Sequence, residues 1–225
     1  MAEELFNKTH EYDQMLQQGL ALSGESKEFF VAGRLADLVG HLPDGFLVKR
    51  VLDFGCGMGG TSRALAEAFP EAEVTGVDTA EDALAYAREN VKLKNVRFEA
   101  LSRIGQGFDL AYVNGVFHHI EPGKRHAAAA LVHGALRPGG RFAFFENNPW
   151  NPGTRLVMSR IPFDRDAIPI PPDEGRELLF GAGFRLEPTR YLFFFPRLLA
   201  YFRIFEPILK EVPMGAQYHI PAVKE

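Results

Sequence analysis

The stretch that decides the fold is VLDFGCGMGG, residues 51–60. Gly55, Gly57 and Gly60 satisfy the pattern G-x-G-x-x-G, which is typical of nicotinamide and flavin dinucleotide sites. Gly55, Gly57 and Gly59 also satisfy G-x-G-x-G, which suggests a methyl donor. Glycines permit a tight turn and a close approach of ligand to backbone, and the following helix start offers unpaired N–H groups. The glycines alone therefore fit either adenosyl-type ligand.

Two acidic residues favour the methyl donor. Asp53 ends the strand before the loop, where a carboxylate would repel a passing pyrophosphate but suits the sulfonium and ammonium of S-adenosylmethionine. Asp78 ends the next strand, EVTGVD, 19 residues after Gly59, where a carboxylate can accept both ribose hydroxyls, in NAD as well. Each acid alone could be a cap or turn residue. Two acids at consecutive strand ends beside a glycine loop are much less expected by accident.

Composition narrows the class of protein. The 225 residues are 46% hydrophobic, enough for one sizeable core, and the formal net charge of −4 lacks the basic excess of a nucleic-acid partner. Cys56 is the single cysteine, so neither an intramolecular disulfide nor a cysteine-based zinc site can form. Without a signal-like apolar segment or a run long enough to cross a membrane, we expect a cytoplasmic protein, with peripheral lipid contact left open.

Strands and helices alternate along most of the chain. This alternation implies βαβ units, a parallel sheet with helices on both faces, and a ligand at the carboxyl ends of the strands. The N-terminal residues 1–42 are expected to be helical, with Ser26 as an N-cap. The expected strands are 46–54, 73–77, 96–101, 108–113, 141–146, 184–194 and 217–223, and the expected later helices are 61–69, 80–90, 124–136, 173–181 and 198–209.

Four segments, VLDFGCGMGG, VTGVD, FDLAYVNGVFHHI and LRPGGRFAFFENN, resemble the class I S-adenosylmethionine-dependent methyltransferases in order and spacing, over about residues 45–147. The resemblance implies an α/β, Rossmann-like doubly wound fold. Its seven-stranded sheet would be mostly parallel with an antiparallel final strand, and helices would cover both faces. We expect a single methyltransferase domain over 1–225, with an N-terminal helical cap at 1–44, a cofactor-binding half at 45–147 and an acceptor-side, sheet-completing half at 148–225.

The resemblance also assigns residues to the cofactor S-adenosyl-L-methionine. Many relatives place an aspartate near position 102 to bind the adenine amino group, and here a hydroxyl or backbone group must serve. The residues so assigned are Asp53, Gly55, Cys56 and Gly57 for the methionine part, Asp78 and Thr79 for the ribose, Leu101 and Ser102 for adenine, and Asn114 under the sulfonium.

Two histidines are candidates for catalysis. His118 and His119 follow the fourth strand, beside the expected methyl group, and a base of near-neutral pKa suits deprotonation of a hydroxyl acceptor. The alternative is that they pack at a strand-to-helix junction. No metal site is expected, because His119, His126 and His133 are spaced by seven, whereas one metal needs helical i,i+4 pairs. Cys56 is expected to fill space in the loop and not to act as a nucleophile.

Two later segments are expected near the acceptor. Asn147, Asn148 and Trp150, in ENNPWNP, are acceptor-pocket candidates, and the alternative is a proline-rich turn anchored by the tryptophan. Residues 193–210, FFFPRLLAYFRIFEPILK, contain a broad apolar helical face. We interpret this face as core, with a dimer surface or a wall for a lipophilic acceptor or membrane as alternatives.

The sequence therefore predicts an enzyme that transfers a methyl group from S-adenosylmethionine to a small-molecule acceptor, for which apolar and aromatic compounds are candidates. A non-catalytic module that binds S-adenosylmethionine or a partner is the alternative, and a nicotinamide oxidoreductase is a third. The acceptor, the methylated atom (O, N, C or S) and the oligomeric state stay open.

Overall fold

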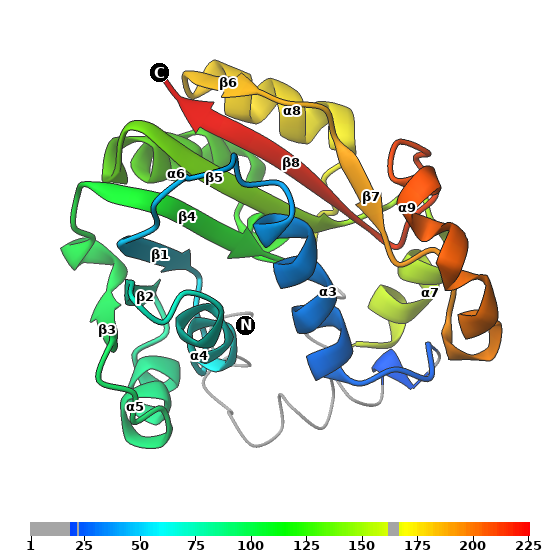
Figure 1. Cartoon of the computed structure of the whole chain (residues 1–225), viewed down its shortest axis with the longest axis horizontal. Helices are drawn as coiled ribbons and strands as arrows, with labels where there is room; N and C mark the ends of the chain where they lie inside the picture. The colour runs from blue at the N-terminus through cyan, green and yellow to red at the C-terminus, as the bar shows by residue number, and fades with distance from the viewer. Residues whose placement is uncertain (1–18, 22, 162–166) are drawn as a thin grey trace.

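The computed structural model describes residues 19–21, 23–161 and 167–225. Within them one sheet has eight strands in the order β3-β2-β1-β4-β5-β8-β6, and β7 also pairs with β8. The first five strands pair in parallel, whereas β8 runs antiparallel to β5. The predicted α/β class and the antiparallel final strand are confirmed (Figure 1). The strands are β1 Arg50–Phe54, β2 Glu73–Asp78, β3 Val96–Ala100, β4 Phe108–Asn114, β5 Leu136–Asn147, β6 Phe184–Leu186, β7 Arg190–Leu192 and β8 Gln217–Lys224.

The eighth strand results from a break in the expected strand 184–194. Phe184 pairs with Lys224 at the start of β6, and Arg190 pairs with His219 at the start of β7, so the register shifts by one residue between them. Pro188 lies in the gap, and a proline cannot donate to a strand ladder. The break falls at an edge of the sheet, where such an interruption is tolerated.

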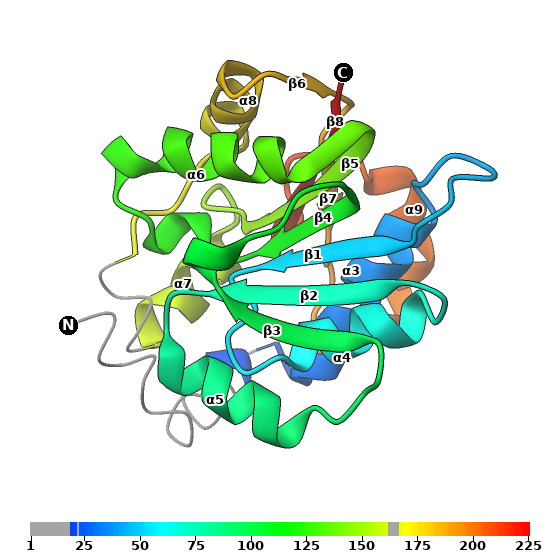
Figure 2. The same cartoon turned by 90° about the vertical axis from the view of Figure 1, so that its left-hand side faces the viewer.

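Helices cover both faces of the sheet, as predicted (Figure 2). Alternate residues of each strand point to opposite faces. Leu52 therefore packs in the core cluster that includes α6 and α8, and Val51 packs in the cluster that includes α3 and α4. The helices are α3 Lys27–Val39, α4 Gly60–Ala68, α5 Glu81–Asn90, α6 Pro122–Ala135, α7 Pro152–Arg160, α8 Pro172–Gly181 and α9 Glu206–Leu209, with the 3₁₀ helices η1 Leu101–Arg103, η2 Phe117–His119 and η4 Arg197–Phe205.

Helix α3 is fixed to the sheet by buried polar side chains. Its N-cap is Ser26, as predicted, whose Oγ accepts a hydrogen bond from Phe29 N at 3.3 Å. Arg34 Nε donates to the Tyr112 hydroxyl at 2.9 Å, which joins the helix to β4. Residues 1–18, also expected to be helical, lie outside the described residues.

Asp37 of α3 is the centre of a buried ionic cluster. Its carboxylate accepts hydrogen bonds from Arg190 Nη2 at 2.8 Å, Lys210 Nζ at 2.9 Å and His219 Nδ1 at 2.9 Å. These partners outweigh the effect of burial and hold the pKa of Asp37 well below its usual range. One side chain therefore ties α3 to β7, to β8 and to the end of α9.

The interpretation of residues 198–209 as a core helix is wrong. The segment forms η4 followed by the short α9, and its large apolar side chains are exposed. In the part of the chain that the structure describes, no helix has both the length and the apolar character needed to cross a membrane.

Candidate active site

A cavity of about 1210 Å³ lies at the carboxyl ends of β1, β2 and β4. This is where ligands bind in open α/β sheets. One end is bounded by the glycine loop and Asp78, and the other by side chains from α3, α7 and the loop after β7. The cavity brings together ten of the predicted site residues: the loop residues Gly55, Cys56 and Gly57, followed by Asp78, Thr79, Leu101, Asn114, His118, His119 and Asn147.

The glycine loop needs its glycines for two different reasons. Gly55, Gly57 and Gly59 all have positive φ, at 75°, 50° and 78°. A Cβ on Gly55 would lie 2.4 Å from Val116 Cγ2, and one on Gly59 would lie 2.6 Å from Phe98 Cζ. A Cβ on Gly57 would meet no atom of the described chain within 4 Å, although Gly57 lines the cavity. The backbone at Gly57 is therefore open to a ligand, as an adenosyl cofactor requires.

Asp78 is held at the cavity by the loop itself. Its Oδ2 accepts a hydrogen bond from Gly57 N at 2.8 Å, and its Oδ1 accepts one from Ala80 N at 2.9 Å. Each carboxylate oxygen keeps acceptor capacity for a ligand hydroxyl. Thr79 and Leu101 line the cavity beside it, whereas the exposed Ser102 does not.

Asp53 lies behind the loop and does not line the cavity. Its side chain is buried, and Oδ2 accepts a hydrogen bond from Ser62 Oγ at 2.6 Å, at the start of α4. Burial, and to a lesser extent the nearby Asp78 carboxylate, raise the pKa of Asp53 to about 7. Contact between Asp53 and a cationic cofactor stays a prediction. Burial also raises the pKa of the Cys56 thiol, which makes a thiolate unfavourable there.

Asn114 supplies a polar atom that fits a bound ligand. It ends β4 and lines the cavity. Its Oδ1 is buried and has no hydrogen-bond partner among the described residues. Because buried polar atoms are rarely left unsatisfied, this amide oxygen indicates a ligand group at the position predicted for the sulfonium end of the cofactor.

His118 forms a buried pair with Glu146 at the same end of the sheet. Nδ1 of His118 lies 2.5 Å from Oε2 of Glu146, and Oε1 of Glu146 accepts a hydrogen bond from Phe117 N at 2.8 Å. A carboxylate can only accept, so Nδ1 carries the proton and Nε2 is the basic nitrogen of this tautomer. The His119 ring packs on the His118 ring with centroids 4.1 Å apart. The sequence placed both histidines, but not the carboxylate 28 residues later that orients one of them.

The acceptor-pocket candidates from ENNPWNP separate in the structure. Asn147 lines the cavity, and its Oδ1 accepts a hydrogen bond from Gln217 Nε2 at 3.1 Å. Asn148 is instead fully buried and donates to Gly215 O at 2.8 Å, so it holds the chain after β5 to the chain before β8. Trp150 is 47% exposed and does not line the cavity. Both residues lie in a turn, as the alternative had it, but the turn is anchored by the buried Asn148, whose Oδ1 accepts a hydrogen bond from Trp150 N at 3.1 Å, and not by the exposed tryptophan.

An aromatic wall lies at the other end of the cavity, and residues 193–195 of it belong to the segment for which a wall beside a lipophilic acceptor was one alternative. Phe30 of α3 contacts Phe193 edge-on, with centroids 4.9 Å apart. Phe193 has a φ of 62°, a left-handed conformation that a phenylalanine adopts at a cost of about 1 kcal/mol or more. Further lining residues are Phe29, Phe194, Phe195, Leu156, Val157 and Met158. The signal in the sequence was the run FFFP, residues 193–196, of which Phe193 and Phe194 were expected to end a strand.

The histidines at 119, 126 and 133 do not converge. His126 Nε2 contacts the Gly181 carbonyl at 3.0 Å, and His133 packs edge-on against Phe184. Among the residues described, no group of three or more His, Cys, Asp or Glu side chains is arranged to hold a metal ion.

Comparisons with known proteins agree with this geometry. Residues 51–140 match the family model described as a methyltransferase domain. The chain is 32% identical over 117 residues to trans-aconitate 2-methyltransferase of Rhodopseudomonas palustris strain BisB18, over 51% of this chain and 45% of that protein. It is 34% identical over 111 residues to ribosomal RNA large subunit methyltransferase G of Streptomyces coelicolor, over 44% of this chain and 29% of that protein. The chain thus spans less than half of the length of these curated relatives.

A solved structure extends the likeness of the fold. A SAM-dependent methyltransferase from Archaeoglobus fulgidus superposes with a TM-score of 0.66 at 19% identity, over 88% of this chain and 95% of that one. At this identity the superposition concerns the fold alone, and the match to the domain model concerns the residues around the glycine loop. Residues 51–140 therefore form a methyltransferase domain, and the loop, Asp78 and the strand order are those of the class I methyltransferases, whose cofactor is S-adenosylmethionine.

Proposed function

We propose that the protein transfers a methyl group from S-adenosylmethionine to a small apolar or aromatic acceptor. The observation that carries this proposal is that one cavity joins the glycine loop, Asn114 and His118 to an aromatic wall. Its volume of about 1210 Å³ exceeds the roughly 300–1,000 Å³ of a site for one drug-sized ligand, so it has space for a cofactor and a second molecule.

At the cofactor end, the residues bind and orient. S-adenosylmethionine, when bound, supplies a methyl group on a positively charged sulfur. The Gly57 backbone would let the cofactor approach, the Asp78 carboxylate would accept hydrogen bonds from the ribose hydroxyls, and the Asn114 amide oxygen would face the positive end. Holding both reactants in line supplies much of the rate in such a displacement.

At the acceptor end, His118 moves a proton. Its Nε2 takes the proton from an acceptor hydroxyl or amine, while Glu146 holds Nδ1–H and stabilises the imidazolium that forms. The acceptor packs against Phe30 and Phe193, which exclude water from the site. The acidic net charge of the chain favours a small molecule over a nucleic acid as acceptor.

Cofactor binding can be tested with a matched pair of glycine variants. Gly57→Val should abolish calorimetric binding of S-adenosylmethionine, because the new side chain points into the cavity. Gly45→Val should leave it unchanged: Gly45 also has a positive φ, 76°, and open space around it, but lies outside the cavity. Equal binding by the two variants would contradict the proposed site.

Catalysis can be tested by release of S-adenosylhomocysteine with a panel of small phenols, amines and carboxylic acids. We expect turnover with at least one apolar or aromatic member. His118→Asn should lower kcat by about 10²-fold or more, and Glu146→Gln should lower it less and shift the pH profile. Cofactor binding without turnover on any acceptor, nucleic acids included, would favour a non-catalytic binding module.

A further inference from the structure

Arg34 of α3 is a buried cation at the acceptor end of the cavity. It is 5% exposed and lines the cavity. Its Nε donates to the Tyr112 hydroxyl and its Nη1 donates to Gln217 Oε1, both at 2.9 Å, and both acceptors are neutral. A guanidinium stays charged and has five N–H donors. Three donors of Arg34, including both on Nη2, therefore have no partner in the described part of the chain.

The other arginine that is buried among the described residues has a carboxylate partner. Arg125 is 2% exposed, and its Nη1 pairs with Oε1 of Glu174 at 2.8 Å. Arg34 pairs with no carboxylate of the described residues. Burying a charge without a counter-charge is costly. The charge of Arg34 therefore indicates an anionic group that a ligand in the cavity supplies.

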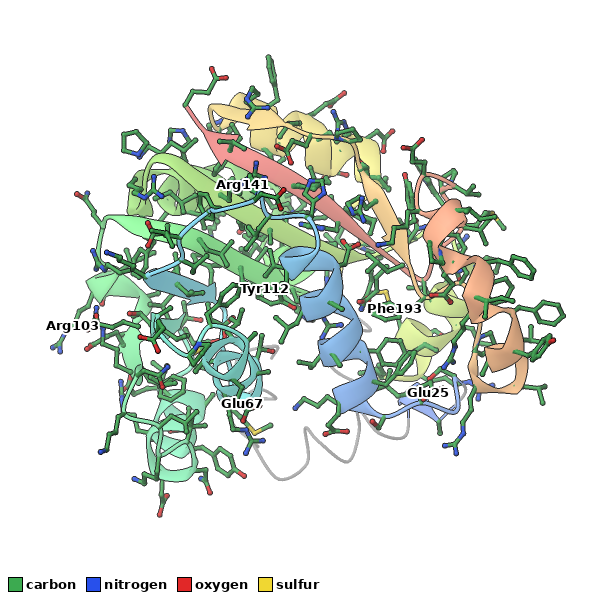
Figure 3. The ribbon with its side chains drawn as sticks, in the orientation of Figure 1. Glu25, Glu67, Arg103, Tyr112, Arg141 and Phe193 are labelled. Carbon is green, nitrogen blue, oxygen red and sulfur yellow. The ribbon has the colours of Figure 1, made fainter. Side chains whose placement is uncertain are left out.

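Helix α3 holds Arg34 beside the aromatic wall. Phe30 and Arg34 are four residues apart, so they lie on the same face of the helix, one turn from each other. Phe193 packs on the same helix, since a Cβ on Gly33 would lie 2.5 Å from Phe193 Cε1. Figure 3 shows Tyr112 and Phe193 on opposite sides of α3 in that view, with Tyr112 toward β4. An apolar molecule packed on the wall would therefore have its polar end at the guanidinium.

Arg34 and His118 reach the cavity from opposite faces of the sheet. His118 pairs with Glu146, whereas Gln217, the partner of Arg34, donates to Asn147. Glu146 and Asn147 are consecutive residues of β5, so their side chains point to opposite faces. An anion bound by Arg34 is therefore a different group from the one whose proton His118 would take.

We propose that Arg34 binds the carboxylate of an acceptor that also carries a separate hydroxyl or amine. The proposal rests on the proposed methyl transfer and narrows the acceptor to a small apolar or aromatic acid. A guanidinium can hold both oxygens of a carboxylate through two parallel N–H bonds. One arginine also balances the single charge of a carboxylate, whereas a phosphate monoester carries nearly two charges.

The cofactor has a carboxylate of its own, on its methionine part. The cation of α3 that lies beside the glycine loop is Lys27, whose Nζ would be 3.9 Å from a Cβ on Gly60. Arg34 lies two helical turns further along α3, against β4 and β8. This position favours the acceptor as the source of the carboxylate that Arg34 binds.

Pairs of acids and amides test the charge of the acceptor without turnover. Calorimetry on protein saturated with S-adenosylhomocysteine would compare p-hydroxybenzoate, p-hydroxyphenylacetate and p-hydroxycinnamate with their carboxamides, which have nearly the same shape but no charge. At least one acid should bind the wild-type protein about tenfold or more tightly than its amide. Arg34→Met should bind acid and amide equally, with the Kd of the amide within about twofold of wild type. Arg34→Lys should keep a smaller preference for the acid, because lysine has the charge without the planar fork.

Arg176→Met is the matched control. Arg176 also donates to neutral oxygens, to Glu187 O at 2.8 Å and to Thr189 Oγ1 at 3.2 Å, but it lies outside the cavity. This variant should therefore keep the wild-type preference for the acid. An equal loss of the preference in Arg176→Met and Arg34→Met would overturn the proposal.

Three further results would overturn the proposal. The wild-type protein could bind none of the acids, or bind them no more tightly than the amides, or Arg34→Met could keep the preference for the acid. If Arg34→Met kept that preference and bound S-adenosylhomocysteine about tenfold more weakly, the carboxylate held by Arg34 would be that of the cofactor. Failure of the proposed methyl transfer is distinguishable, because acid and amide can also be compared on cofactor-free protein and the comparison needs no turnover.

Discussion

The two ends of the cavity are built in different ways. The cofactor end consists mainly of backbone: three glycines with positive φ, held by Val77 O, which accepts from Gly55 N at 2.8 Å and from Cys56 N at 3.1 Å. The acceptor end consists of side chains from α3, α7 and the loop after β7, together with Gln217 of β8. The glycine loop and Asp78 are encoded within about 30 consecutive residues, whereas the acceptor end assembles only when distant parts of the chain meet.

This difference has a consequence for stability. The cofactor end depends on glycines that have positive φ or no room for a side chain, so substitution of these glycines should disturb it most. Ionic contacts between distant elements hold the acceptor end, with Asp37 as the common partner of Arg190, Lys210 and His219. Variants at the two ends should therefore fail in different ways.

Asp37→Ala should have the largest effect. It leaves Arg190, Lys210 and His219 without their carboxylate partner, all three at buried or half-buried positions. The free energy of unfolding should therefore fall by about 3–5 kcal/mol in urea denaturation. Glu81→Ala, which breaks the exposed pair with Arg88, is the control and should change it by less than about 1 kcal/mol. A similar loss of stability in both variants would contradict the idea that the buried cluster contributes more than an exposed ion pair.

Gly59→Ala should have the next largest effect, at the cofactor end. Gly59 and Gly45 have nearly equal φ, 78° and 76°, so alanine strains both backbones by about 1 kcal/mol. At Gly59 the new Cβ would also lie 2.6 Å from Phe98 Cζ, which should add about 1–3 kcal/mol of destabilisation. Gly45→Ala is the control. The difference in free energy of unfolding between Gly59→Ala and Gly45→Ala, measured by thermal or urea unfolding, gives the cost of the crowding alone. No difference would show that Phe98 moves aside freely.

The pH dependence of two buried aspartates should have opposite signs. The folded-state pKa of Asp53, about 7, is above its ordinary value of 3.8, so the unfolded chain releases this proton first. Stability from Asp53 is therefore present below pH 4 and falls as pH rises, by about 2 kcal/mol between pH 5 and pH 7. Asp53→Asn should remove that fall in urea denaturation of the cofactor-free protein.

Asp109 should show the opposite pH dependence to Asp53. Its hydrogen bonds to Arg137 Nε and to the backbone of Lys49 and Arg50 hold its pKa below the ordinary value, despite burial. Its contribution is present at neutral pH and is lost as pH falls through the folded-state pKa. Asp109→Asn should therefore destabilise at pH 7 more than at pH 3. Identical pH slopes for the two variants would contradict the environments described here.

Phe30→Ala should have the smallest effect, and this effect should be confined to the acceptor end of the cavity. Removing its ring takes away the edge-on contact with Phe193 and part of the aromatic wall. Once an acceptor is known, we expect its KM to rise about tenfold, while the Kd for S-adenosylmethionine stays within about twofold. Phe180→Ala, on the exposed surface of α8, is the control for both constants. Equal weakening of cofactor and acceptor would mean that the two ends are not separate.

The sequence predicted the cofactor half well because its signals are local. Glycines that need positive φ, an acid at a strand end and apolar runs of strand length each act within a few residues. Strands β1 to β5, helices α4 to α6 and the positions of Gly57, Asp78 and Asn114 could therefore be placed from the order of residues. Boundaries shifted where a proline does not end an element, as in β5, which begins at Leu136 and contains Pro138.

Tertiary structure decided the remaining features, because each depends on groups far apart in the chain. The sequence cannot show that Glu146 orients His118 across neighbouring strands, or that Asp53 turns toward Ser62 and away from the cavity. The apolar pattern of residues 198–209 predicted a buried face, but Glu206 and Arg203 bind the backbone of the preceding loop and expose that face. A hydrophobic pattern specifies which side chains share a side of a segment, and only the contacts on the other side determine which way that segment turns.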